Sequence, residues 1–106
     1  AKAFRKQLFK LSDRSGSLKF SRVARASRTE NRINQNRLKS DDTFVLDDGF
    51  TCWVWIGSGA SAAERGLGVS YAMKYLKDKN RPAFLPITVI REGSEPAMFK
   101  EQLVDK

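Results

Sequence analysis

The segment 51–56, Thr-Cys-Trp-Val-Trp-Ile, constrains the fold most, because both of its faces are apolar. Alternate side chains of a strand point to opposite faces of a sheet. The two faces of this segment are therefore made by Cys52, Val54 and Ile56 on one side, and by Trp53 and Trp55 on the other. A strand of this kind must be covered on both sides. The segment predicts the central strand of a sheet with packed layers on both faces.

A hairpin signal precedes this strand. The apolar runs 43–46 and 51–56 flank Asp-Asp-Gly at 47–49, and Asp-Gly between two such runs is typical of a β-hairpin. Gly-Ser-Gly at 57–59 then turns the chain, and Ser-Ala-Ala-Glu at 61–64 has the pattern of a capping box that opens a helix. The sequence predicts a strand–turn–strand–turn–helix unit here.

Three further segments have the pattern of strands. Apolar residues alternate over 4–11 and, less regularly, over 18–23, and each segment predicts a strand. Residues 85–90 are apolar on both faces. This segment therefore predicts another covered strand, which shares the centre of the sheet with 51–56.

Two segments have the pattern of helices. The longer runs from about Ser61 to Lys77, with two adjacent rows formed by Leu67, Tyr71 and Tyr75 and by Gly68, Ala72 and Leu76. Its two interior glycines cost about 1 kcal/mol each relative to alanine, which indicates a close approach by either the domain's own sheet or a partner. A short helix is expected after Ser94, with Met98, Phe99 and Leu103 on its buried side. These elements predict a small α+β domain, a mixed sheet between two helices.

Composition limits the classes of function. The 106 residues suffice for one domain with its own core. Cys52 is the only cysteine, so no disulfide forms within the chain, and it is expected to be a small core residue of a protein in a reducing compartment. The chain has no histidine, which excludes His-based triads and His-ligated zinc. No nucleophile–base pair or phosphate-cradling loop appears, so no enzyme is expected.

Charge indicates an acidic partner. The chain has 20 lysines and arginines against 12 acidic residues, a net charge of +8, which suits nucleic acid, a phosphoinositide membrane or an acidic protein surface. Where the apolar pattern stops, a basic loop is predicted, and its candidate binding patch is Arg22, Arg25, Arg28, Arg32, Arg37 and Lys39. The pattern leaves open whether this loop binds a partner or is only solvated. Against nucleic acid, the tryptophans lie in a covered strand and do not form a stacking platform.

Taken together, these segments resemble a gelsolin-like domain of the gelsolin, villin and severin family of actin-binding proteins. The resemblance rests on residues 38–49, 53–57, 60–65 and 92–100, covers nearly the whole chain apart from 22–37, and is greatest to a third domain. It implies a sheet of five or six strands between a long helix along the strands and a short helix across them. It also implies a single domain, 1–106, excised from a multidomain cytoplasmic protein of the cytoskeleton. Such a module severs or caps filaments, with actin and sister domains as partners.

The resemblance further implies a calcium site. By position, the ligands are the Asp41 backbone carbonyl, the Asp42 carboxylate and the Glu64 carboxylate, and oxygen ligands of this kind suit Ca²⁺. The residues alone leave an alternative open, in which Glu64 belongs only to the capping box and the two aspartates are solvated turn residues. A second calcium site of the family uses an aspartate late in the long helix. That position is Leu76 in this chain, so the second site is not expected.

Overall fold

In the computed structural model, the described residues are 5–13, 16–27, 29–82 and 85–104, and the side chain of Glu64 also lies outside the description. In chain order, the elements are β1 (Gln7–Ser12), β2 (Lys19–Arg25), β3 (Ile33–Asn34), the 3-10 helix η1 (Gln35–Arg37), β4 (Thr43–Asp47), β5 (Cys52–Ile56), α1 (Ala62–Asp78), β6 (Ile87–Arg91), α2 (Ala97–Lys100) and β7 (Leu103–Val104). Within these residues, no helix is long and apolar enough to cross a membrane.

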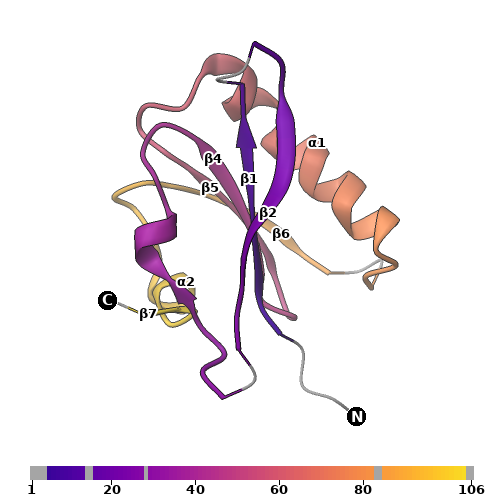
Figure 1. Cartoon of the computed structure of the whole chain (residues 1–106), viewed down its shortest axis with the longest axis vertical. Coiled ribbons are helices and arrows are strands. Elements are labelled where there is room, and N and C mark those ends of the chain that lie inside the picture. The colour runs from indigo at the N-terminus through magenta and orange to yellow at the C-terminus, as the bar shows by residue number, and fades with distance from the viewer. Residues whose placement is uncertain (1–4, 14–15, 28, 83–84, 105–106) are drawn as a thin grey trace.

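Five strands form one mixed sheet in the order β2-β1-β4-β5-β6. All neighbours are antiparallel except β5 and β6, which are parallel because α1 connects them. Figure 1 shows α1 on one side of the sheet, and η1, α2 and the short β3–β7 pair on the other. The predicted fold class, α+β with a mixed sheet of five or six strands between one long and one short helix, is confirmed, and the sheet has five strands.

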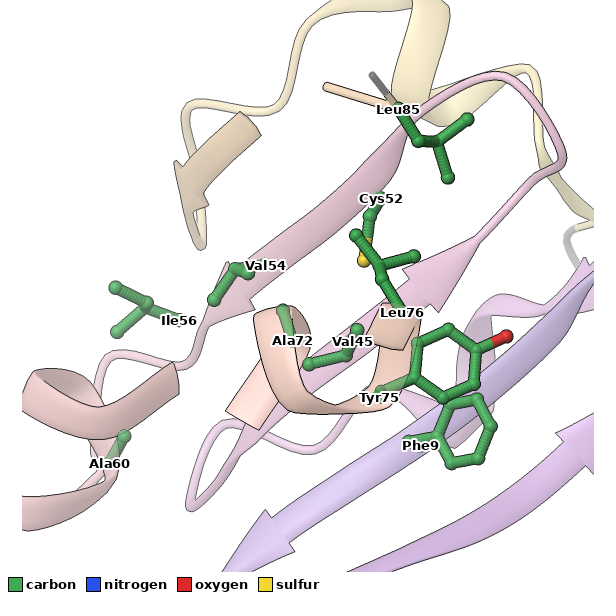
Figure 2. Packing of buried hydrophobic residues seen from close by; sticks show 10 residues of the cluster. All are labelled: Phe9, Val45, Cys52, Val54, Ile56, Ala60, Ala72, Tyr75, Leu76 and Leu85. Carbon is green, nitrogen blue, oxygen red and sulfur yellow. The ribbon is translucent and has the colours of Figure 1, made fainter. Parts of the chain in front are cut away.

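Every residue of β5 is buried, as its two apolar faces predict. On the α1 side lie Phe9, Val45, Cys52, Val54, Ile56, Ala60, Ala72, Tyr75, Leu76 and Leu85, shown in Figure 2. On the other side lie Leu8, Ala26, Ile33, Phe44, Leu46, Trp53, Trp55, Ile90 and Phe99. Burial raises the pKa of the Cys52 thiol to about 12, and the charges of Asp47 and Asp48 add to this effect. The thiol therefore stays protonated and belongs to the core.

The hairpin aspartates are buried, whereas the sequence placed both in an ordinary turn. Asp48 Oδ1 accepts the backbone N–H groups of Phe50 at 2.8 Å and Thr51 at 2.7 Å, and its Oδ2 accepts Trp53 Nε1 at 2.8 Å. Gly49 completes the turn with φ of 94°, a conformation that favours glycine. Asp48 thus fixes both the turn and the ring of Trp53.

Asp47 attaches the carboxyl end of α1 to the sheet. It is fully buried, and its Oδ2 accepts bonds from Tyr75 Oη at 2.6 Å and Arg81 Nε at 2.8 Å. Burial, and then the bond to Asp47, raise the pKa of the Tyr75 hydroxyl, so it remains the donor. The Asp47 bond also raises the pKa of Arg81. Because Asp47 is in β4 and its partners are in α1 and just beyond it, this cluster fixes where α1 ends.

Three predictions about elements are corrected by the structure. The segment 85–90 was expected in the centre of the sheet, but β6 is an edge strand and Val89 is 47% exposed. The short helix is one turn that begins after Pro96, not after Ser94. One turn buries only one of the expected side chains, so Phe99 is buried, Met98 is 65% exposed, and Leu103 lies in β7.

The predicted basic loop is also more ordered than expected. Its first residues, through Arg25, extend β2, because β1 offers backbone partners along its whole length. Ala26 and Ile33 then bury their side chains in the core, and the Asn34 side chain accepts the Asn36 N–H at 2.9 Å to cap η1. The sequence did not predict this order, because two buried apolar residues and one capping residue are too few to form the apolar periodicity of a strand or helix.

We expect Trp53→Ala to lower the free energy of unfolding by about 3–5 kcal/mol, because the buried ring leaves a cavity. Its ring meets that of Phe99 edge-on, with centroids 5.5 Å apart. Trp53→Phe keeps a ring and loses mainly the bond to Asp48, so it should cost about 1–3 kcal/mol. Urea denaturation measures both. A loss below about 1 kcal/mol for Trp53→Ala would contradict a strand covered on both faces.

Candidate functional site

Two turns contact each other at the end of the hairpin where β4 begins and β5 ends. Residues 40–42 lead into β4, and residues 57–59 leave β5 toward α1. Gly59 N donates to the Ser40 carbonyl at 2.8 Å, and Gly57 N donates to the Asp42 carbonyl at 3.1 Å. We call this pair of segments the turn contact. It places the acidic residues before β4 beside the start of α1.

The turn contact requires glycine at position 57. A Cβ atom there would lie 2.3 Å from the Ser40 carbonyl oxygen and 2.6 Å from that of Asp42, closer than real Cβ atoms approach other atoms. At Gly59, a Cβ atom would lie 3.5 Å from Asp41 Oδ1, so the Asp41 carboxylate lies directly over the second turn. The Gly-Ser-Gly sequence is thus explained by backbone packing against the acidic segment.

The structure brings the predicted calcium residues to one place, as far as it describes them. Asp41 is exposed, and Asp42 is only 2% exposed, with its Oδ1 atom buried. Glu64 belongs to the first turn of α1, and its side chain lies outside the described residues. The Asp41 backbone carbonyl and the Asp42 carboxylate are oxygen ligands of the kind that Ca²⁺ prefers, so the chemistry of the described residues fits the ion.

The described side chains alone do not complete a metal site. Among them, no group of three or more histidine, cysteine, aspartate or glutamate residues could hold a metal ion. The predicted set also needs the Glu64 carboxylate, which lies outside the described side chains, and the calcium site stays a prediction. The position of the family's second calcium site is Leu76, which packs in the α1-side core.

Glu92, which was not predicted as a site residue, bridges the two turns. Its Oε2 accepts Ser40 Oγ at 2.6 Å, and its Oε1 accepts Ser58 N at 2.8 Å. The bond from Ser40, followed by that from Ser58, lowers the pKa of Glu92 below its usual 4.5. The carboxylate is therefore charged and bonded at neutral pH, and this bonding is lost as the pH falls through the lowered pKa. No local pattern indicates this role, because Glu92 lies 52 residues from Ser40.

The structure brings the predicted basic patch together only in part. Arg22 is on β2 and donates a hydrogen bond to Gln7 at 3.1 Å, and Arg25 is the last residue of β2. Arg32 is exposed just before β3, and Arg28 lies outside the described residues. Arg37 and Lys39 instead join Lys10, which was not predicted, around a cavity of about 450 Å³. The other lining residues are Val23, Asn34, Asn36 and Phe44. We call it the basic cavity, and none of the described residues that line it is a carboxylate.

One face of α1 is exposed and carries two apolar side chains. Helix positions three and four apart share a face, and the outer face of α1 is defined here as Gly66, Val69, Ser70, Met73 and Lys77. Met73 is 58% exposed and Val69 is 37% exposed. A Cβ atom at Gly66 would meet nothing within 4 Å, whereas at Gly68 it would lie 2.9 Å from Val54 Cγ1. Gly68 therefore serves the domain's own sheet, and Gly66 keeps the outer face open.

Comparisons with known proteins agree on one family. The family model of the gelsolin repeat matches residues 27–100. Gelsolin of Drosophila melanogaster is 37% identical over 94 residues, 89% of this chain and 11% of that protein. Gelsolin-like protein 2 of Lumbricus terrestris is 37% identical over 98 residues, 92% of this chain and 25% of that protein. Advillin of Mus musculus is 33% identical over 95 residues, which are 89% of this chain and 11% of that protein. The chain thus spans a quarter or less of these relatives.

Solved structures show the same relationship. A chain in the crystal structure of the Thorarchaeota 2DGel3/rabbit actin complex matches with a TM-score of 0.75 and 31% identity, over 93% of this chain and 45% of that one. A chain in the crystal structure of the Thorarchaeota ProGel/rabbit actin complex matches with a TM-score of 0.72 and 22% identity. This match covers 93% of this chain and 99% of that one. The second likeness concerns the fold alone.

We expect Gly57→Ala to destabilise the domain by about 1–3 kcal/mol, the usual cost of an overpacked site, because its methyl group would separate the two turns. Gly66→Ala is the matched control. It makes the same change on the open face of α1, where alanine should stabilise the helix by about 0.5–1 kcal/mol. Urea denaturation of both variants measures the difference. Equal effects of the two substitutions would contradict the turn contact.

Proposed function

The chain belongs to the gelsolin repeat family, and on that premise we propose that it is a calcium-responsive actin-binding module of a protein that severs or caps filaments. It acts by binding and not by catalysis. Because it spans a quarter or less of the relatives named above, it functions as one repeat beside sister repeats. We place that protein in the cytoplasm, at the actin cytoskeleton.

The outer face of α1 is the single observation that carries actin binding. An exposed apolar patch on a charged domain marks a protein–protein surface, and here Val69 and Met73 supply the apolar side chains. Gly66, which precedes Val69 on the same face, leaves room for a partner backbone to approach. Actin is the partner proposed, because a relative that is 31% identical was solved in complex with rabbit actin.

Calcium binds, in this proposal, at the turn contact. The Asp41 backbone carbonyl and the Asp42 and Glu64 carboxylates would hold the ion, which neutralises their mutual repulsion and links the start of β4 to the first turn of α1. The buried position of Asp42 supports this, since a buried carboxylate is stabilised by a nearby positive charge. Ordering the start of α1 also orders its outer face, which is how calcium would favour actin binding.

We expect Met73→Glu to weaken actin binding by about tenfold or more, as loss of a central interface contact does, and to leave the melting temperature nearly unchanged. Cosedimentation with actin in calcium and in chelator measures the affinity, and wild type should bind more strongly in calcium. Met98→Glu is the matched control, because Met98 is also exposed (65%) and lies in α2, away from α1. Equal binding by the two variants would contradict docking through α1.

A second candidate function rests on the basic cavity. Lys10, Arg37 and Lys39 supply three positive charges and two asparagines supply amide donors, a combination that suits phosphate groups. We propose a phosphoinositide headgroup as the ligand. Nucleic acid, the alternative ligand of a basic domain, is less favoured because Trp53 and Trp55 are buried and unable to stack on bases.

For this candidate, we expect Arg37→Glu with Lys39→Glu to reduce binding to phosphoinositide vesicles by about thirtyfold or more, given about 1 kcal/mol per basic residue near an anionic surface. Both side chains are exposed, so stability should change little. Lys77→Glu with Lys79→Glu is the charge-matched control outside the cavity. If the two double variants lose the same affinity, net charge explains the binding and the cavity does not. Binding to an oligonucleotide with steep salt dependence would favour the nucleic-acid alternative.

A further inference from the structure

We propose that Glu92 is a positioning residue for the cation site, because it fixes the segment that carries Asp41 and Asp42 against the segment that leads into α1. This inference rests on the proposed calcium function. It adds a residue from a third part of the chain, the end of β6, which contributes no ligand of its own. Glu92 acts through Ser40 and Ser58.

The geometry of the bridge supports this role. Glu92 Oε2 accepts Ser40 Oγ at 2.6 Å, and Ser40 is the residue directly before Asp41. Glu92 Oε1 accepts Ser58 N at 2.8 Å, and Ser58 lies between the two glycines of the second turn. The Glu92 carboxylate therefore binds one residue from each segment of the turn contact. It links the same two segments that the backbone bonds of Gly57 and Gly59 join.

Glu92 is itself held by the sheet. Its backbone N donates to the Ile56 carbonyl at 2.9 Å, which continues the β5–β6 pairing by one residue. Just beyond it, Glu95 accepts Gly93 N at 3.1 Å and Trp55 Nε1 at 2.8 Å, and so attaches the following turn to β5. The bridging carboxylate thus projects from a fixed support, as a group that orients ligands must.

A direct role as ligand is less consistent with the structure. Both carboxylate oxygens of Glu92 already accept hydrogen bonds, from Ser40 Oγ and Ser58 N. Groups that orient metal ligands typically affect metal affinity by about 10–100-fold. This is the behaviour expected of a residue that keeps the Asp41–Asp42 segment next to Glu64.

The test is calorimetric titration of the chain with calcium. We expect Glu92→Ala to weaken calcium binding about tenfold, because the two turns lose their bridge. Glu92→Gln removes the same charge but keeps the bridge, since its amide oxygen accepts Ser58 N and its amide nitrogen donates to Ser40 Oγ. Its affinity should stay within about threefold of wild type. Glu101→Ala, at an exposed position after α2, is the control for lost negative charge.

Amide hydrogen exchange gives a second measurement that needs no calcium. Without the ion, Glu92→Ala should speed exchange at Ser58 and at neighbouring Gly59, while Glu92→Gln should not. Coupling between sites is reciprocal. Calcium should therefore slow exchange at Ser58 in wild type by about the same factor by which Glu92→Ala weakens calcium binding.

The outcomes separate this inference from the function on which it rests. Wild type that binds calcium with the same affinity as Glu92→Ala would overturn the positioning role and leave the calcium site in place. Equal losses for Glu92→Ala and Glu92→Gln would also overturn it, because the effect would then be one of charge. Wild type that binds no calcium would overturn the proposed function together with this inference.

Discussion

The backbone contact between residues 40–42 and 57–59 is the constraint on which the rest of the structure depends. It joins the two ends of the β4–β5 hairpin through Gly57 N and Gly59 N, and it leaves no room for a side chain at position 57. Because 57–59 leads directly into α1, the same contact fixes where that helix starts. The acidic segment, the central strand and the long helix therefore meet at one point.

The other end of α1 is fixed by a different interaction. Fully buried Asp47 binds Tyr75 and Arg81, and removal of one partner from such a pair leaves a buried charge at a cost of about 3–5 kcal/mol. Both ends of α1 are thus attached to the hairpin, and its outer face, with Met73 and Val69, is exposed to solvent. In our proposal, calcium would order the first turn of this helix further.

Local patterns predicted the hairpin, the covered strand β5 and the extent of α1, because periodicity and turn residues act within a few positions. They did not reveal that β6 is an edge strand, because the apolar pattern of a segment does not show whether a second strand pairs with its other side. Glu92 and Asp47 were missed for a related reason: each acts on residues distant in sequence, 52 positions in the case of Ser40. The calcium ligands proposed from the sequence, Asp41, Asp42 and Glu64, stay a prediction, whereas the bridge that Glu92 makes between the two turns was not predicted.

The central claim is that calcium binds where the two turns meet the start of α1. An NMR titration of the ¹⁵N-labelled chain with calcium tests it most directly, because each backbone amide reports separately. We predict large shifts confined to residues 40–42, 57–59 and the first turn of α1, which disappear in Asp42→Asn. Shifts spread over the acidic residues of the whole surface, or none at millimolar calcium, would contradict the account.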